Sequence, residues 1–182
     1  MSTLLHHRLA ERHRLEALAC YDIDNPHLRQ QLDAIAMRTA MHLEMPTALT
    51  TLMLDNAMLI AGGHGVDGWL RGGPGGPAEW AFCAQTVLTG EPYIVPDARK
   101  DPTQCTNPVV ELDGVRAYAG APLITASGHI LGAHCVIDMA PHVFSADEIA
   151  ELQSAATDVV TAFEQHPSRY SAEYKPSFFD LG

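Results

Sequence analysis

The chain has 182 residues, of which 47% are apolar and 18% charged, and its formal net charge is −11 at pH 7. This length suits one globular domain with a core of its own. The excess of acidic residues argues against binding to nucleic acid or to an anionic membrane surface, because both need clustered Lys and Arg. No run of about 18 apolar residues occurs, which excludes a helix that spans a membrane.

Two further features of the sequence indicate a cytoplasmic protein. The first residues, MSTLLHHRLAERH, are interrupted by His and Arg and lack the continuous apolar segment of an export signal. Cys20, Cys83, Cys105 and Cys135 lie far apart without a C-x-x-C pair, so we expect reduced thiols rather than disulfides.

The N-terminal part of the chain predicts two helices. Apolar residues at helical spacing predict the first over about residues 4–19. The second is expected to begin with Asn25 as its N-cap and Pro26 at its first helical position. Apolar residues between Leu32 and Leu43 recur on one face of this helix, as in a helix that covers a core.

Strand-forming residues follow the second helix. Residues 47–54 and 58–63 are predicted to pair as a hairpin. The segment GGPGGP at 72–77 is expected to form a surface loop within one domain. Glycine loses much entropy in regular structure, and proline lacks an N–H donor, so neither residue favours a helix or a strand.

The middle of the chain alternates short elements with a long loop. A short helix is predicted over residues 78–88 and a short strand at 93–95. Residues 96–108 contain three prolines and predict an irregular loop. Residues 114–124 and 129–138 then predict two strands joined by a tight turn.

The last helix has a clear N-terminal signal. Ser145 and Glu148 match a capping box, and Phe144 and Ile149 stand where a hydrophobic staple closes over it. This pattern predicts a helix with an apolar face that extends to Phe163.

Together these elements predict an α+β fold. Strands that follow one another through hairpins imply an antiparallel sheet, with the N- and C-terminal helices on one face. Long loops and the short middle helix must then cover the other face, where a pocket for a small molecule is expected. In this interpretation residues 1–165 form one domain, and residues 166–182, which have no periodicity, form a tail.

Alternation along the strand at 129–138 separates His134 from Cys135. Successive side chains of a strand point to opposite faces, so these two side chains cannot meet. We expect Cys135 to pack under the helices as a core thiol and His134 to face the pocket. His134 then either contacts a ligand or bonds to a neighbouring backbone group, and both roles stay open.

On the preceding strand, Arg116 and Tyr118 share one face. The planar guanidinium of Arg116 could hold a carboxylate or a phosphate of a ligand. The alternative, which the many acidic residues favour, is a structural ion pair with a residue such as Asp97 or Asp113.

In order along the chain, the segments RLEALACYDIDNP, FCAQTVLTGEPYIVPDARKDP and GVRAYAGAPLITASGHILGAHCVID resemble a GAF domain over roughly residues 14–163. They are most similar to the bacterial subgroup found beside histidine kinases, phosphatases and diguanylate cyclases. The resemblance implies a central antiparallel sheet of about six strands, with a pocket between the sheet and the FCAQTV helix. It implies these ligand-binding positions: Trp80, Phe82, Cys83, Asp97, Arg116, Tyr118, His134 and Asp138.

The resemblance also implies a sensory or regulatory function. GAF domains bind cyclic nucleotides, haem, bilins or metabolites, and some have no known ligand. We expect a small-molecule ligand in the pocket. Output would pass to a signalling partner or to a homodimer formed through the exposed sides of the first and last helices.

The alternative is a small GAF-fold enzyme with Cys or His chemistry, similar to the free methionine sulfoxide reductases. Such an enzyme needs an accessible thiol of low pKa, and Cys105 in the long loop is a candidate. The cysteine-rich loop of that branch is not recognisable here, so a non-catalytic function is favoured. The ten histidines show no H-x-x-x-H spacing, so no metal site is predicted, and the sequence does not support a haem or bilin cofactor.

Overall fold

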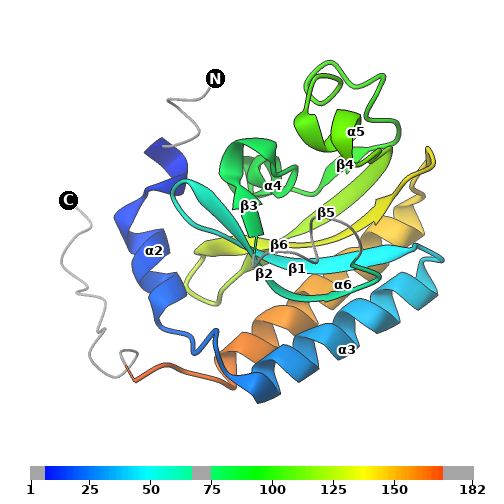
Figure 1. The fold of residues 1–182 in the computed structure, drawn as a ribbon. Helices are drawn as coiled ribbons and strands as arrows, with labels where there is room; N and C mark the ends of the chain where they lie inside the picture. The colour runs from blue at the N-terminus through cyan, green and yellow to red at the C-terminus, as the bar shows by residue number, and fades with distance from the viewer. Residues whose placement is uncertain (1–6, 67–74, 170–182) are drawn as a thin grey trace.

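The computed structural model describes residues 7–66 and 75–169, and these build one antiparallel sheet flanked by helices (Figure 1). The sheet has six strands in the order β3-β2-β1-β6-β5-β4. The strands are β1 (Thr47–Met53), β2 (Ala57–His64), β3 (Gly75–Pro77), β4 (Tyr93–Val95), β5 (Ala117–Ile124) and β6 (Ile130–Asp138). Every neighbouring pair is antiparallel, which confirms the predicted α+β class and the count of six strands.

Two long helices cover one face of the sheet, which we call the helix face. They are α3 (Pro26–His42) and α6 (Ala146–Glu164), and they lie side by side (Figure 1). The opposite face, which we call the cavity face, carries α4 (Cys83–Thr89), α5 (Pro108–Leu112) and the loops around them. None of the helices in the described ranges has the length and apolar content needed to cross a bilayer.

The two predicted helix starts on the helix face are confirmed by their caps. The Asn25 side chain accepts hydrogen bonds from the backbone N–H groups of His27 and Leu28, at 3.0 and 3.4 Å. Glu148 N–H donates to Ser145 Oγ at 3.2 Å, and Ser145 N–H donates to Glu148 Oε2 at 2.7 Å. These bonds satisfy N–H groups that the first helical turn cannot pair, so both helices begin where the local sequence directs.

The predicted first helix is wrong in its continuity. Residues 4–6 lie outside the described residues, and α2 begins only at Arg12 and ends at Ala19. The guanidinium of Arg14 turns inward and donates to the carbonyl oxygens of Leu9 and Met53. Residues 10 and 11 are not helical and separate the helical turn at residues 7–9 from α2.

The prediction of a loop throughout residues 72–77 is also wrong, since Gly75–Pro77 forms β3 against β2. Residues 72–74 lie outside the described residues. A Cβ on Gly75 would collide with the carbonyl oxygen of Met58, so the absence of a side chain is what lets the two backbones approach. Pro77 is tolerated because β3 is an edge strand.

Helix α5 was missed at the sequence level, although its signal is present. Asn107 caps it by accepting from Val109 N–H at 3.0 Å, and Pro108 follows at the first helical position. The pair repeats the Asn25-Pro26 start of α3. The helix has only five residues, too few to show an apolar periodicity, so the cap was its sole local indication.

Candidate functional site

A cavity of about 430 Å³ lies between the cavity face of the sheet and the segment that leads into α4. Side chains of β1 and β6 form its floor, and the turn before α4 and the segment around α5 form its walls. The described lining consists of Pro46, Thr47, Leu49, Thr51, Met58, Gly65, Pro77, Trp80, Ala81, Phe82, Cys83, Val109, Asp113, Val115, Tyr118, Cys135, Ile137 and Met139.

Four of the predicted site residues lie at this cavity: Trp80, Phe82, Cys83 and Tyr118. The rings of Phe82 and Tyr118 pack with their centroids 5.1 Å apart, and Tyr93 packs against Tyr118 from behind at 6.1 Å. Trp80 is 38% exposed, which places it at the rim rather than at the floor. The cavity therefore has an aromatic wall that is held in place by ring packing.

Asp97 and Arg116 are brought together, but they do not line the cavity. Arg116 donates from Nε to Asp97 Oδ1 at 2.9 Å and from Nη2 to Asp97 Oδ2 at 3.0 Å. These hydrogen bonds lower the pKa of the Asp97 carboxyl to about 2 and raise the pKa of Arg116. The structure thus places Arg116 in the ion pair that was the alternative to a ligand clamp.

Asp138 also lies outside the cavity lining, at the end of β6. Its side chain accepts from the Ala140 N–H at 3.0 Å, and its carbonyl oxygen accepts from the Arg116 N–H at 2.8 Å. Both contacts hold the chain as it leaves the strand. Asp138 therefore has a local structural contact that the sequence did not indicate.

The prediction of which face His134 and Cys135 occupy is wrong, because the two are exchanged. Cys135 lines the cavity, whereas His134 is completely buried on the helix face and contacts Thr39 of α3. Both faces of β6 are apolar, so alternation separates the two sets of side chains without indicating which set the long helices cover. A bulge adds to the difficulty, since Ile130 to Ala133 opposes only Pro122 to Ile124 of β5.

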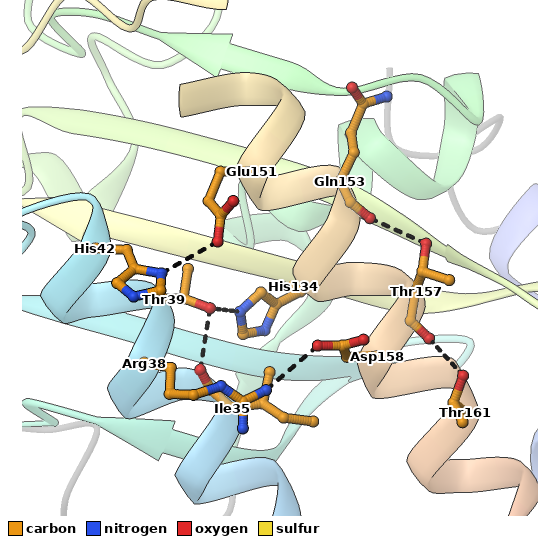
Figure 2. Close-up of polar contacts among 10 residues, drawn as sticks. All are labelled: Ile35, Arg38, Thr39, His42, His134, Glu151, Gln153, Thr157, Asp158 and Thr161. Atoms are coloured by element: carbon orange, nitrogen blue, oxygen red, sulfur yellow. Dashed lines mark hydrogen bonds and ion pairs between the residues drawn. The ribbon is translucent and has the colours of Figure 1, made fainter. Parts of the chain in front are cut away.

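The hydrogen bonds of His134 define its tautomer. Thr39 Oγ1 donates its single hydrogen to the Ile35 carbonyl at 3.0 Å, so at 2.9 Å it can only accept from His134 Nε2 (Figure 2). His134 Nδ1 then accepts from Thr50 Oγ1 at 3.1 Å. Burial lowers the pKa of His134 to about 4, which keeps the ring neutral at pH 7. His134 therefore ties β6 and β1 to α3.

The two thiols at the cavity are poor nucleophiles. Cys83 and Cys135 are both buried, and burial raises the pKa of Cys83 to about 11 and that of Cys135 further. The thiol of Cys83 lies 3.4 Å from the sulfur of Met53 and donates to it. Cys105 is exposed and does not line the cavity. A low-pKa thiol of the kind that catalysis needs is thus missing from the described lining.

Sequence reasoning missed the contributions of β1 and of the segment around α5. Thr47, Leu49 and Thr51 alternate along β1 and all reach the cavity, so period-2 alternation was the signal that could have found them. Val109 and Asp113 come from the segment around α5. Tertiary packing brings this segment to the cavity, and no local sequence pattern indicates that position.

Within residues 7–66 and 75–169, no three His, Cys, Asp or Glu side chains are grouped as metal ligands.

An antiparallel six-stranded sheet with two long helices on one face and a roofed cavity on the other defines a class of small α+β folds. The family model of the GAF domain matches residues 27–163, and the chain belongs to this family.

One curated relative and two solved structures illustrate what the chain is similar to. A cyclic di-GMP phosphodiesterase of Pseudomonas aeruginosa is 46% identical over 66 residues, which is 36% of this chain but 11% of that protein. The GAF domain of a phosphoenolpyruvate-protein phosphotransferase from Coxiella burnetii has a TM-score of 0.65 at 17% identity, with 94% of this chain and 97% of that chain covered.

A free methionine-R-sulfoxide reductase from Thermoplasma acidophilum has a TM-score of 0.63 at 13% identity, with 78% of this chain and 95% of that chain covered. At these identities the two solved structures show the fold alone. The same fold thus occurs in a domain of a phosphotransferase and in an enzyme that reduces a sulfoxide.

Proposed function

We propose that this GAF domain is a sensory or regulatory module that binds a small molecule in the cavity beneath α4. The observation that carries the proposal is the cavity itself, which at about 430 Å³ falls in the range of small-molecule sites. Its lining is mostly apolar, with the packed rings of Phe82 and Tyr118 in one wall. A ligand enclosed there would favour one arrangement of the α4 and α5 segments, which is a shift of population.

The ligand-dependent arrangement would be read by a signalling partner or by a second copy of the chain. The first and last helices offer exposed sides for such contacts. On α3, which packs beside the last helix, Met37 is 43% and Met41 is 67% exposed. All four cysteines are free thiols, in keeping with the cytoplasmic location that we propose.

The test combines native mass spectrometry with a thermal-shift screen of metabolite mixtures on the full chain. Ala81→Phe fills the cavity, and Ala150→Phe makes the same change on the exposed surface of α6 as its control. We expect a retained mass or a stabilising metabolite with the natural chain and with Ala150→Phe, but not with Ala81→Phe. Binding that survives Ala81→Phe, or no binding by any compound, contradicts the proposal.

A second candidate function is reduction of a free sulfoxide, which the fold likeness to the Thermoplasma acidophilum reductase favours. The raised pKa of Cys83 and of Cys135 opposes it, because the thiolate is the attacking species. The test is turnover of free methionine sulfoxide with dithiothreitol, compared between the natural chain and Cys105→Ser. We expect no turnover, and turnover lost in Cys105→Ser would establish the enzyme instead.

A further inference from the structure

The hydroxyl groups of the two threonines that line the cavity have already donated their hydrogens to the protein. Thr47 Oγ1 donates to the Gly65 carbonyl at 2.9 Å, and Thr51 Oγ1 donates to the Ala133 carbonyl at 3.2 Å. A threonine hydroxyl has one hydrogen and two lone pairs. With its hydrogen used in this way, each hydroxyl can only accept from a further group.

The Cys83 thiol and the Tyr118 hydroxyl are also directed toward the protein rather than toward the cavity. The thiol of Cys83 donates to the Met53 sulfur at 3.4 Å. The hydroxyl of Tyr118 is buried and lies against Gly120, where a Cβ would collide with it. Tyr118 thus offers the cavity its ring rather than its O–H group.

The described lining contains no Lys, Arg or His. Arg116, a basic residue of the chain just before β5, is held in its two hydrogen bonds to Asp97 and lies outside the lining. Asp113 adds a carboxylate, which is also an acceptor. An anion entering this cavity would lose its hydration without meeting a described positive charge, which is costly.

We propose, building on the function proposed above, that the ligand is an uncharged, ring-containing molecule with at least one N–H or O–H donor. The ring packs against Phe82 and Tyr118, because flat apolar molecules stack well on such a wall. The donor faces the hydroxyl oxygens of Thr47 and Thr51 on β1. The described lining offers no positive charge to an anionic ligand such as a nucleotide, so this class is expected to bind more weakly.

Three matched probes test this class by calorimetry on the full chain at pH 7: indole, 1-methylindole and indole-3-carboxylate. Indole is an uncharged ring with a donor, 1-methylindole lacks the donor, and the carboxylate adds a negative charge. We expect 1-methylindole to bind about fivefold more weakly than indole, which is the worth of one net hydrogen bond. The carboxylate should bind at least about tenfold more weakly, because its charge is desolvated without a partner.

The variant Thr51→Val removes one acceptor at nearly constant shape. In this variant the affinity for indole should exceed the affinity for 1-methylindole by no more than about twofold. Thr86→Val is the control, since Thr86 is also a completely buried threonine on the cavity face but does not line the cavity. This control should leave the advantage of indole unchanged.

The outcomes separate the ligand class from the function on which it rests. Equal or tighter binding of indole-3-carboxylate, or no binding of indole at all, overturns the ligand class while the metabolite screen still judges the sensor function. Binding of all three probes that persists in Ala81→Phe means that the cavity is not the site, and then both proposals fail.

Discussion

The two faces of the sheet differ in how fully their buried polar groups are hydrogen-bonded and in how much empty volume lies beside them. On the helix face, His134 is completely buried and both of its ring nitrogens have partners, in Thr39 of α3 and Thr50 of β1. On the cavity face, the hydroxyl groups of Thr86 and Tyr118 are buried, and neither makes a well-formed hydrogen bond within the described part of the chain. The cavity of about 430 Å³ lies on that same side.

This difference between the faces indicates that the helix face serves stability and the cavity face serves binding. A buried polar network that is fully satisfied holds one arrangement, whereas unpaired polar atoms and empty volume leave contacts unmade. The helix face therefore fixes α3 on the sheet, and the cavity face keeps room for a ligand. Each prediction below changes one face and compares it with the other or with the surface.

The largest expected effect is on the packing of the helix face. Leu123→Ala removes a completely buried side chain of β5 from the core under the helices and should cost about 4 kcal/mol. Leu49→Ala removes a buried side chain of β1 that lines the cavity and should cost only about 2 kcal/mol, because part of its surface already lacks neighbours. Urea unfolding measures both free energies. A cost for Leu49→Ala that equals or exceeds that of Leu123→Ala would remove the distinction between the faces.

The next effect concerns pH and again falls on the helix face. The pKa of His134 is about 4 in the folded protein and about 6.5 in the unfolded chain, so the unfolded chain binds more protons between these values. The contribution of neutral His134 to the free energy of unfolding is therefore fully present above pH 6.5. It falls by about 3 kcal/mol as the pH is lowered to 4.

The measurement is the free energy of unfolding in urea from pH 7 to pH 4, for the natural chain and for His134→Gln. A glutamine can accept and donate as the neutral ring does, yet it does not titrate. The variant should lose about 3 kcal/mol less than the natural chain over this range, since all other titrating groups are shared. Parallel pH profiles would mean that His134 is not held neutral by its burial.

A somewhat smaller effect isolates the bond between the sheet and α3. Thr39→Val removes the acceptor of His134 Nε2 and should cost about 2 kcal/mol, because a buried N–H is left unpaired. Thr157→Val is the matched control: Thr157 makes the same hydroxyl bond to the carbonyl four residues earlier, at 3.1 Å to Gln153, but it is exposed on α6 (Figure 2). The control should change stability by less than about 0.5 kcal/mol. Equal costs would show that the bond to His134 contributes nothing of its own.

The sequence predicted those features that depend on local chemistry. The Asn25-Pro26 and Ser145-Glu148 starts follow from side chains that cap their own helices, and the hairpin of β1 and β2 follows from strand propensity around a short turn. Four cavity residues, Trp80 among them, came from the family resemblance. Period-2 alternation correctly separated His134 from Cys135 on β6.

The sequence did not predict features that depend on contacts between distant segments. The orientation of β6 is decided by which set of side chains α3 covers, and the bond from His134 to Thr39 joins residues 95 positions apart. Arg14 of α2 is buried because Met53, 39 positions away, supplies a carbonyl acceptor for its guanidinium. Strand β3 exists because Gly75 can approach the Met58 carbonyl closely, which is a property of the pair rather than of the glycine.

The smallest expected effect is on the ion pairs that bridge α3 and α6 at the surface. Arg38 Nη2 lies 3.3 Å from Asp158 Oδ2, with the two side chains 55% and 60% exposed (Figure 2). Asp158→Asn should change the free energy of unfolding by less than about 0.5 kcal/mol, because water and salt screen a pair at this exposure. The same measurement in 1 M NaCl should leave the natural chain and the variant still closer together. A loss of 2 kcal/mol in the free energy of unfolding would mean that surface charges hold the two helices together. A loss below 0.5 kcal/mol assigns it to the packing and the buried His134 network beneath them.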